Sequence, residues 1–389
     1  MREPEANSFS LPSKPNRRQV ITRIAGAAGL AAAAGFGLPA FAQARTIRIG
    51  ASFDNSSVEK ANGIALFVGS SAYFNAVNRA GGINGSKVEL VMADDQFKPD
   101  IAKANALAFA ADSSVLAMVH PLGTRQTAEI SDAVPGMAVV GPNTGTVSLR
   151  KKAAPNTFWV RANYDQELDR LIATAAVLGQ SRIGIVYSED PLGQSLLAGF
   201  KAALAKAKLE PAVIASTPST TSMEVDAAAA KIAAAEPQIV IIGLAGTAPA
   251  FVRALRKAGG KSSAYGLSIT ASALGAMGDL AHGLGFAIVV PSPFATKFEI
   301  VRRYQADMLA NGVKEFSLPS LEGYMDACVL AEGLRRAGPS PTRAGVIAAL
   351  DHIEGYDLGG VKINYGRGNR EGNQFVDVAV ISSNGRLIS

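Results

Sequence analysis

Polar residues that could hold a small molecule follow the apolar runs of this sequence. Six short stretches are rich in hydroxyl, amide and glycine residues, namely 54–57, 121–124, 143–146, 190–193, 244–247 and 268–270. Hydroxyl groups and the N–H groups at the start of a helix are typical partners for a carboxylate or carbonyl oxygen. The stretches contain no paired nucleophile and base, so they favour binding over turnover.

Two short motifs look catalytic but lack a required residue. Residues 259–262 (GGKS) resemble the end of a phosphate-binding loop, but Leu255 stands where its first glycine is needed. We interpret the two glycines as the end of a helix. Residues 193–195 resemble a nucleophile elbow, but Leu197 replaces its closing glycine. The first strand is also followed by polar residues instead of a dinucleotide-binding glycine motif.

Histidine, aspartate and cysteine give no metal or cofactor signal. The three histidines are far apart and lack metal-ligand spacing, and we interpret His120 as a structural hydrogen-bonding residue. Asp94 and Asp95 fit either a metal or acid–base pair, or carboxylates that bind backbone amides or cap the next helix, and we favour the second interpretation. The single cysteine, Cys328, excludes an internal disulfide and is expected to be a buried, unreactive thiol. We therefore expect no metal and no cofactor.

The clearest local pattern is a strand, loop, helix, strand and loop between residues 115 and 146. Residues 115–119 and 137–140 are apolar, residues 125–133 read as a helix, and each apolar run is followed by a polar loop. This is a βαβ unit, and small ligands of open parallel sheets lie at the carboxyl ends of the strands. The two loops therefore predict one side of a ligand site.

The same alternation continues along the chain. Further strands are expected at 46–53, 87–93, 182–187, 211–215, 238–242, 285–290 and 374–381. Further helices are expected at 59–80, 99–111, 165–178, 194–207, 224–235, 248–258, 297–311, 319–337 and 342–350. A turn at Asn384 and Gly385 predicts a final hairpin. Two such series in 389 residues, with no flexible linker, predict an α/β protein of two lobes packed across a crevice.

Composition and the N-terminus restrict the class further. The chain is 48% hydrophobic and 18% charged, and the mixed charges behind its net +6 give no nucleic-acid footprint. A twin-arginine motif at 16–21 (NRRQVI) precedes an Ala/Gly-rich apolar stretch at 24–41 and a small-x-small sequence that ends at Ala44. We expect cleavage after Ala44 and a periplasmic mature protein. An uncleaved membrane anchor is the alternative, but Pro39 and the many Ala and Gly residues make it weakly hydrophobic.

Several segments taken in order carry a family resemblance. They are 75–95 (NAVNRAGGINGSKVELVMADD), 123–124 (GT), 139–144 (VVGPNT), 188–193, 289–293 (VVPSP), 321–338 (LEGYMDACVLAEGLRRAG) and 375–386 (FVDVAVISSNGR). Together they resemble the branched-chain amino-acid-binding (leucine/isoleucine/valine) family of periplasmic solute receptors of ABC importers. The resemblance implies the type I periplasmic binding protein fold, with two Rossmann-like lobes joined by a three-crossing hinge near Arg161, Val290 and Asn373.

The resemblance also implies how the chain is divided. Residues 1–44 would be the signal peptide, residues 45–161 and 291–373 the N-terminal lobe, and residues 162–290 and 374–389 the C-terminal lobe. It further implies a receptor that is not an enzyme, acts as a monomer, and delivers a small-molecule ligand to an ABC permease in the inner membrane.

Site residues carry over position by position. Gly123, Thr124, Asn143 and Thr144 match first-lobe loops that hold a ligand carboxylate. Asp54 in the first loop is also expected at the site. Asp190 and Gly193 are expected to face these loops from the second lobe.

Three second-lobe positions depart from the family members that bind α-amino acids. Those members tend to have tyrosine at the positions of Leu192 and Ala245, and at the position of Ser268 an acidic residue that holds the ligand ammonium. All three differences remove groups that hold an amino acid, and two of them enlarge the cleft. The hypothesis is therefore an uncharged or acidic ligand without an α-amino group, such as an aromatic or branched carboxylic acid.

Three alternatives stay open at this point. The protein could be a sensing module for a membrane signalling partner, a branched-chain amino-acid receptor, or a secreted amide or ester hydrolase. The missing nucleophile, base and metal signatures argue against the hydrolase.

Overall fold

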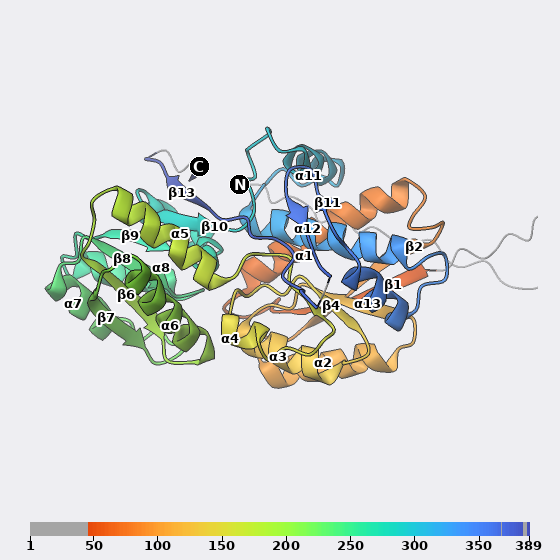
Figure 1. Ribbon diagram of the computed structural model, residues 1–389, viewed down its shortest axis with the longest axis horizontal. Helices are drawn as coiled ribbons and strands as arrows, with labels where there is room; N and C mark the ends of the chain where they lie inside the picture. Colours follow the sequence, from red (N-terminus) through yellow and green to blue (C-terminus); the bar gives the residue numbers. More distant parts are fainter. Residues whose placement is uncertain (1–45, 367, 384–386) are drawn as a thin grey trace, which may run out of the picture. The chain divides into compact units, whose positions relative to one another are not determined.

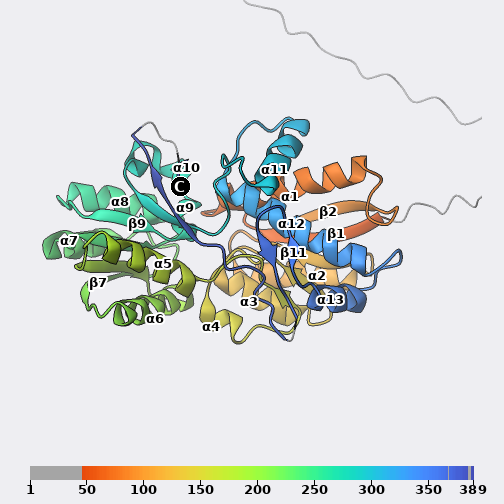
Figure 2. The same cartoon turned by 45° about the horizontal axis from the view of Figure 1, so that its top comes forward.

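The computed structural model describes residues 46–366, 368–383 and 387–389. The expected signal peptide, its cleavage site and the turn at residues 384–385 lie outside the described residues. Figures 1 and 2 show two groups of elements, one built around strands β1–β5 and one around strands β6–β10. Among the described residues, no helix is long and apolar enough to cross a membrane.

The first lobe has a five-stranded parallel sheet in the order β2-β1-β3-β4-β5. Its strands are β1 (Thr46–Phe53), β2 (Lys87–Asp94), β3 (Val115–Val119), β4 (Ala138–Val140) and β5 (Thr157–Phe158). The helices that connect them are α1 (Lys60–Arg79), α2 (Pro99–Ala111), α3 (Thr124–Ala133) and α4 (Val147–Arg150). Later parts of the chain add α11 (Glu299–Ala310), α12 (Leu318–Arg336), α13 (Arg343–Asp351) and a small hairpin of β11 (Tyr356–Asp357) and β12 (Lys362–Ile363).

Helix α12 is the centre of the first lobe's larger core. It is buried along nearly its whole length and packs closely against α1. Two glycines allow this approach. A Cβ atom at Gly69 would lie 1.8 Å from the Ser320 carbonyl oxygen, and one at Gly323 would lie 2.1 Å from the Leu66 carbonyl oxygen. The backbones of the two helices therefore meet where no larger residue fits.

The second lobe has a seven-stranded sheet in the order β14-β13-β10-β9-β8-β6-β7. Its strands are β6 (Ile183–Ser188), β7 (Pro211–Thr217), β8 (Ile239–Gly243), β9 (Ser263–Gly266), β10 (Gly285–Ile288), β13 (Asp377–Ile381) and β14 (Leu387–Ile388). Its helices are α5 (Tyr164–Val177), α6 (Pro191–Lys206), α7 (Asp226–Ala235), α8 (Ala248–Lys257), α9 (Ser268–Ala271), α10 (Leu274–Met277) and the 3₁₀ helix η1 (Gly278–Ala281). Strands β6–β10 are parallel, and apolar clusters cover both faces of this sheet.

The chain passes between the two sheets three times. It leaves the first sheet after β5, returns after β10 to form α11–α13, and enters the second sheet again at β13. Strand β13 runs antiparallel to β10 and pairs with β14, which confirms the predicted final hairpin. The fold class expected from the sequence, two α/β lobes with parallel-sheet cores, is confirmed.

Most predicted elements are present, and the differences have local causes. Helix α6 begins three residues earlier than predicted, because Asp190 caps it and Pro191 occupies its first turn. Strand β9 was not predicted, since its four residues include a serine and a glycine and form no long apolar run. The segment 268–270, expected to be a loop, forms the first turn of α9.

Candidate functional site

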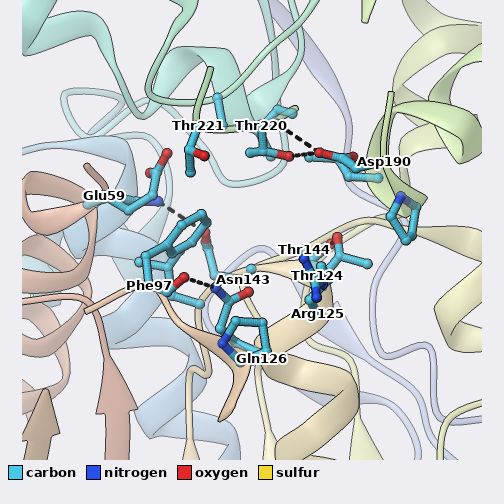
Figure 3. A pocket seen from close by; sticks show the side chains of 18 of the residues that line it. Glu59, Phe97, Thr124, Arg125, Gln126, Asn143, Thr144, Asp190, Thr220 and Thr221 are labelled. Carbon is cyan, nitrogen blue, oxygen red and sulfur yellow. Dashed lines mark hydrogen bonds between the residues drawn. The ribbon is translucent and has the colours of Figure 1, made fainter. Parts of the chain in front are cut away.

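A cavity of about 190 Å³ lies between the two lobes (Figure 3). Its lining includes residues that follow β1, β2, β3 and β4 in the first lobe, and β6, β7, β8 and β9 in the second. The carboxyl ends of both parallel sheets thus face one space, as open α/β sheets usually arrange their ligand sites. The volume suits a solute smaller than a drug-sized ligand, whose pockets measure roughly 300–1,000 Å³.

Most of the predicted site residues line this cavity. They are Gly123, Thr124, Asn143 and Thr144 from the first lobe, and Asp190, Leu192 and Ala245 from the second. The predicted residues Asp54, Gly193 and Ser268 do not line it. Further lining residues were not predicted individually, although Leu122, Pro191 and Ile269 lie in the predicted polar loops. The complete set is Glu59, Asn62, Phe97, Pro99, Leu122, Arg125, Gln126, Tyr164, Pro191, Ser219, Thr220, Thr221, Ile269 and Ser272.

Three threonine hydroxyls form a cluster at one end of the cavity. The Oγ1 atom of Thr124 lies 2.9 Å from that of Thr144 and 2.8 Å from that of Thr146. The remaining pair, Thr144 and Thr146, is 3.0 Å apart. Each hydroxyl has one hydrogen to donate and can accept two hydrogen bonds, so one of the three can turn its hydrogen toward an anion in exchange for one of the internal bonds.

The start of helix α3 adds backbone donors to this end. Its N-cap residue, Gly123, has no side chain that could accept from the first N–H groups, which leaves them available for a ligand. This position requires glycine, because Gly123 has φ of +98° and a Cβ atom there would lie 2.5 Å from Gln126 Oε1. Gln126 in turn donates a 2.7 Å hydrogen bond to the Phe97 carbonyl.

Tyr164 and Arg125 complete the donor end. Tyr164 is fully buried, and its hydroxyl, which is influenced by the Thr144 side chain, makes no well-formed hydrogen bond among the described residues. Burial raises the pKa of Tyr164 to about 12, so the phenol stays protonated and can donate at neutral pH. Arg125, the second residue of α3, lines the cavity from an exposed position and adds a positive charge. This end of the cavity therefore favours a carboxylate.

Asp190 organises the second lobe's side of the cavity. Its carboxylate accepts hydrogen bonds from the N–H of Gly193 (3.0 Å), the N–H of Thr220 (2.8 Å) and the hydroxyls of Ser188 (3.1 Å) and Thr220. These bonds cap α6 and hold the loop at 219–221 beside it. The Asp190 carboxylate therefore already has its hydrogen bonds within the protein. Its neighbours Leu192 and Thr220 also line the cavity.

The three predicted residues outside the cavity have structural partners. Asp54 accepts from the N–H groups of Ser56, Ser57 and Glu59 at 3.1, 2.6 and 2.7 Å and so fixes the start of α1. Gly193 lies where a Cβ atom would be 1.8 Å from the Ser188 carbonyl oxygen, so it permits close packing of α6 on β6.

Ser268 belongs to a buried ionic network at the first crossing between the sheets. Its N–H and hydroxyl donate 2.7 Å bonds to Glu167, and its hydroxyl also contacts the guanidinium of Arg161. Arg161 pairs with Glu167 of α5 at 3.1 Å and with Glu322 of α12 at 3.3 Å. One guanidinium therefore connects helices of the two lobes. Burial raises the pKa of Glu167 even beside this cation.

Other interpretations of single residues are confirmed. Asp94 and Asp95 accept from backbone N–H groups, including those of Asn55 (2.9 Å) and Phe97 (3.0 Å). His120 is buried and bonds through Nε2 to the Ser70 hydroxyl at 3.0 Å. Within the described ranges, no group of three or more His, Cys, Asp or Glu residues could hold a metal ion.

Cys328 and the glycine pair at the end of α8 also agree with the sequence reading. Cys328 is buried, and burial raises the pKa of its thiol to about 12. Gly259 has φ of +79°, and the Gly260 N–H bonds back to the Leu255 carbonyl at 2.9 Å. This is the geometry of a helix end instead of a phosphate loop.

Two of the missed segments had detectable signals. Residues 216–222 (STPSTTS) include the end of β7 and the loop after it, and they are as rich in hydroxyls as the predicted binding loops. Glu59 lies two residues after the first polar stretch and is the first residue of the helix predicted there. Tyr164 gave no signal, since its place in the cavity depends on how the chain crosses between the sheets.

Comparison with known proteins identifies the family. A family model described as periplasmic binding protein matches residues 46–386. The chain belongs to this family. The resemblance noted in the sequence is therefore confirmed.

Two binding proteins of solved structure resemble the chain along nearly its whole described length. A substrate-binding periplasmic protein from Ralstonia solanacearum is 32% identical, with a TM-score of 0.81, and the match covers 88% of this chain and 99% of that one. An extracellular ligand-binding receptor from Verminephrobacter eiseniae is 28% identical, with a TM-score of 0.81, over 88% of this chain and 100% of that one.

Two further similar proteins are named for different ligands. A solute-binding protein from R. palustris in complex with benzoate is 16% identical, with a TM-score of 0.77, over 88% of this chain and 95% of that one. An amino acid binding protein from Pseudomonas aeruginosa is 26% identical over 186 residues. That alignment spans 46% of this chain and 49% of the relative, so about half of the relative's length is matched.

Proposed function

We propose that the protein is an extracytoplasmic solute receptor that closes on a small organic carboxylate and delivers it to an ABC permease in the inner membrane. Membership of the periplasmic binding protein family supports the receptor role. The mature chain would be a monomer in the periplasm, freed from residues 1–44.

The donor end of the cavity carries the proposal for the ligand. A cluster of threonine hydroxyls, the buried Tyr164 phenol, the first turn of α3 and the nearby Arg125 all offer hydrogen-bond donors or positive charge. Among the described residues that line the cavity, no carboxylate fills this end, since Asp190 is held by its own donors on the other side. A ligand carboxylate would satisfy these groups, and binding it would favour the closed arrangement of the lobes.

The same geometry supports a ligand without an α-amino group. An α-ammonium lies one carbon from the carboxylate, so its acceptor must be near the donor end. Of the two acids that line the cavity, Asp190 is saturated with hydrogen bonds. The other, Glu59, lies across the pocket from Thr124 and Thr144 (Figure 3). The apolar residues Leu192 and Ala245 leave room for an aromatic or branched body.

Isothermal titration calorimetry tests the proposal directly. We expect binding of benzoate or a short branched carboxylic acid in preference to leucine or valine. The variant Thr144→Val keeps the shape of the side chain. It should weaken binding of the carboxylate ligand by about five- to twentyfold, since one hydrogen bond to a charged group is lost. Thr174→Val, on the exposed side of α5, is the matched control. Tight leucine binding by the wild type would contradict the ligand class.

Genetic deletion tests the transport role. Loss of uptake of the identified carboxylate by cells, restored by the wild-type gene, is expected of a receptor for an ABC permease. Normal uptake combined with a lost transcriptional response would favour the sensing module instead.

A further inference from the structure

Two residues at the start of α1, Glu59 and Asn62, present hydrogen-bond acceptors to the cavity. Both line it, and each residue is 5% exposed. Glu59 Oε1 accepts a 2.8 Å bond from the N–H of Gly246 in the second lobe. Asn62 uses its amide N–H to donate to Asn143 Oδ1 at 3.2 Å, and its own Oδ1 has no partner among the described residues.

Among the described residues, Glu59 has hydrogen-bond donors but no cationic partner, and Asn62 Oδ1 has no donor. The groups that influence Glu59, besides burial, are Gly246, Asn62 and Asp54, and none of them is a cation. A buried acceptor without a donor, and a buried carboxylate without a counter-charge, are both unfavourable. Two such groups side by side in a ligand cavity indicate that the ligand brings the missing donor.

The two ends of the cavity are chemically opposite and spatially separate. Figure 3 shows Glu59 on the other side of the pocket from Thr124 and Thr144. Apolar lining residues, Leu122, Leu192 and Ile269 among them, complete the walls. A ligand that satisfies both ends must carry an acceptor at one end, a donor at the other, and an apolar body.

We propose that Glu59 and Asn62 form a specificity-determining subsite for a hydrogen-bond donor, so that the ligand is a carboxylic acid with a hydroxyl or amino group at the end remote from its carboxylate. The inference rests on the proposed function, because it takes the carboxylate to occupy the donor end. It adds what the rest of the ligand must contain.

The protonation behaviour of Glu59 agrees with this role. Burial, with a smaller contribution from the nearby Asp54, raises the pKa of Glu59 to about 7. The free carboxyl group can therefore be neutral or charged near neutral pH. A hydroxyl can bind to either form, whereas an ammonium group selects the charged form. Because Glu59 also holds Gly246 of the second lobe, the donor would bind where the two lobes meet.

The test compares matched acids by calorimetry on the mature wild-type protein. The pairs are benzoate against 4-hydroxybenzoate, and pentanoate against 5-hydroxypentanoate and 5-aminopentanoate. At least one acid with a remote donor should bind about tenfold or more tightly than its parent, as expected when a buried acceptor is otherwise left unpaired. A preference for the hydroxyl over the amino compound, or the reverse, identifies which donor the subsite takes.

The variants Glu59→Gln and Asn62→Leu should each reduce this discrimination, and Glu224→Gln, at an exposed position, is the control. A change in the discrimination ratio, with parent acids still bound, separates a specificity role from simple loss of folding. If the wild type binds parent and substituted acids equally, the subsite is refuted while carboxylate binding stands. If the wild type binds none of the acids, the proposed carboxylate site and the subsite are both refuted.

Discussion

Replacing Arg161 by methionine would isolate the ionic contact that connects the two lobes. The guanidinium is 2% exposed and pairs with Glu167, which is 0% exposed, and with Glu322, which is 9% exposed. Methionine fills similar space but leaves both carboxylates without their cation. The variant therefore tests how much of the hinge depends on one charge.

The expected loss of unfolding free energy in Arg161→Met depends on pH. Breaking a buried ion pair by removing one partner costs about 3–5 kcal/mol of unfolding free energy when the remaining charges cannot be neutralised. Without Arg161, burial would raise the pKa of Glu167 still further above its unfolded value. An acid whose pKa is raised on folding destabilises the protein as pH rises, because the unfolded state then binds fewer protons. At pH 5, about 0.7 unit above the unfolded pKa of a glutamate, protonation of Glu167 limits the penalty at that carboxylate to about 1 kcal/mol.

Urea denaturation of Arg161→Met and the wild type at pH 5 and pH 8 measures both quantities. We expect the difference in unfolding free energy to be about 3–5 kcal/mol at pH 8 and at most about 2 kcal/mol at pH 5. Arg253→Met, at an exposed position on α8, should change little at either pH. A loss below about 1 kcal/mol at pH 8, or an equal loss at both pH values, would refute the reasoning.

Three other measurements check separate parts of the structure. Tyr164→Phe removes the unpartnered donor at the carboxylate end and should weaken ligand binding by about tenfold or more in calorimetry; unchanged affinity would remove Tyr164 from the site. Because the pKa of Glu59 is raised from 4.5 to about 7, the unliganded wild type should lose about 3 kcal/mol more stability than Glu59→Gln as pH rises through that range, and parallel pH profiles would contradict this. Gly193→Ala should lower the unfolding free energy by about 1–3 kcal/mol in thermal denaturation, whereas Gly136→Ala, with open space around it, should not, and equal melting temperatures for both would argue against the close packing of α6.

Regular elements were predicted well because their signals are local. The strand Thr46–Phe53 and the helix Pro99–Ala111 have the predicted bounds, since β-branched alternation and a proline at the first helical turn act within a few residues. The four-residue strand β9 and the two-residue strand β5 have no comparable pattern. They exist because neighbouring strands offer them hydrogen bonds, and only the assembled sheet provides that.

Some residues of the candidate site could likewise be predicted from local sequence, and others could not. The loops at Gly123–Thr124 and Asn143–Thr144 could be found from the sequence, because a polar loop after a buried strand must emerge at the sheet's carboxyl edge. Ser268 was expected at the same cavity, but the hinge charges of Arg161 and Glu167 hold its hydroxyl outside it. No local sequence pattern predicts that contact, since it joins residues about a hundred positions apart.

By itself, the sequence determined the two-lobed α/β fold, its family and the hydroxyl-rich loops, because periodicity and short motifs depend on neighbours along the chain. The tertiary structure alone decided which side chains face the ligand cavity. Packing of the two lobes buried Glu59 against Gly246 and placed it across the cavity from Thr124 and Thr144. Within the described part of the chain, it also left Asn62 Oδ1 and the Tyr164 hydroxyl without a well-formed hydrogen bond. Burial and missing partners are properties of the folded chain, and they are what give these residues their expected selectivity.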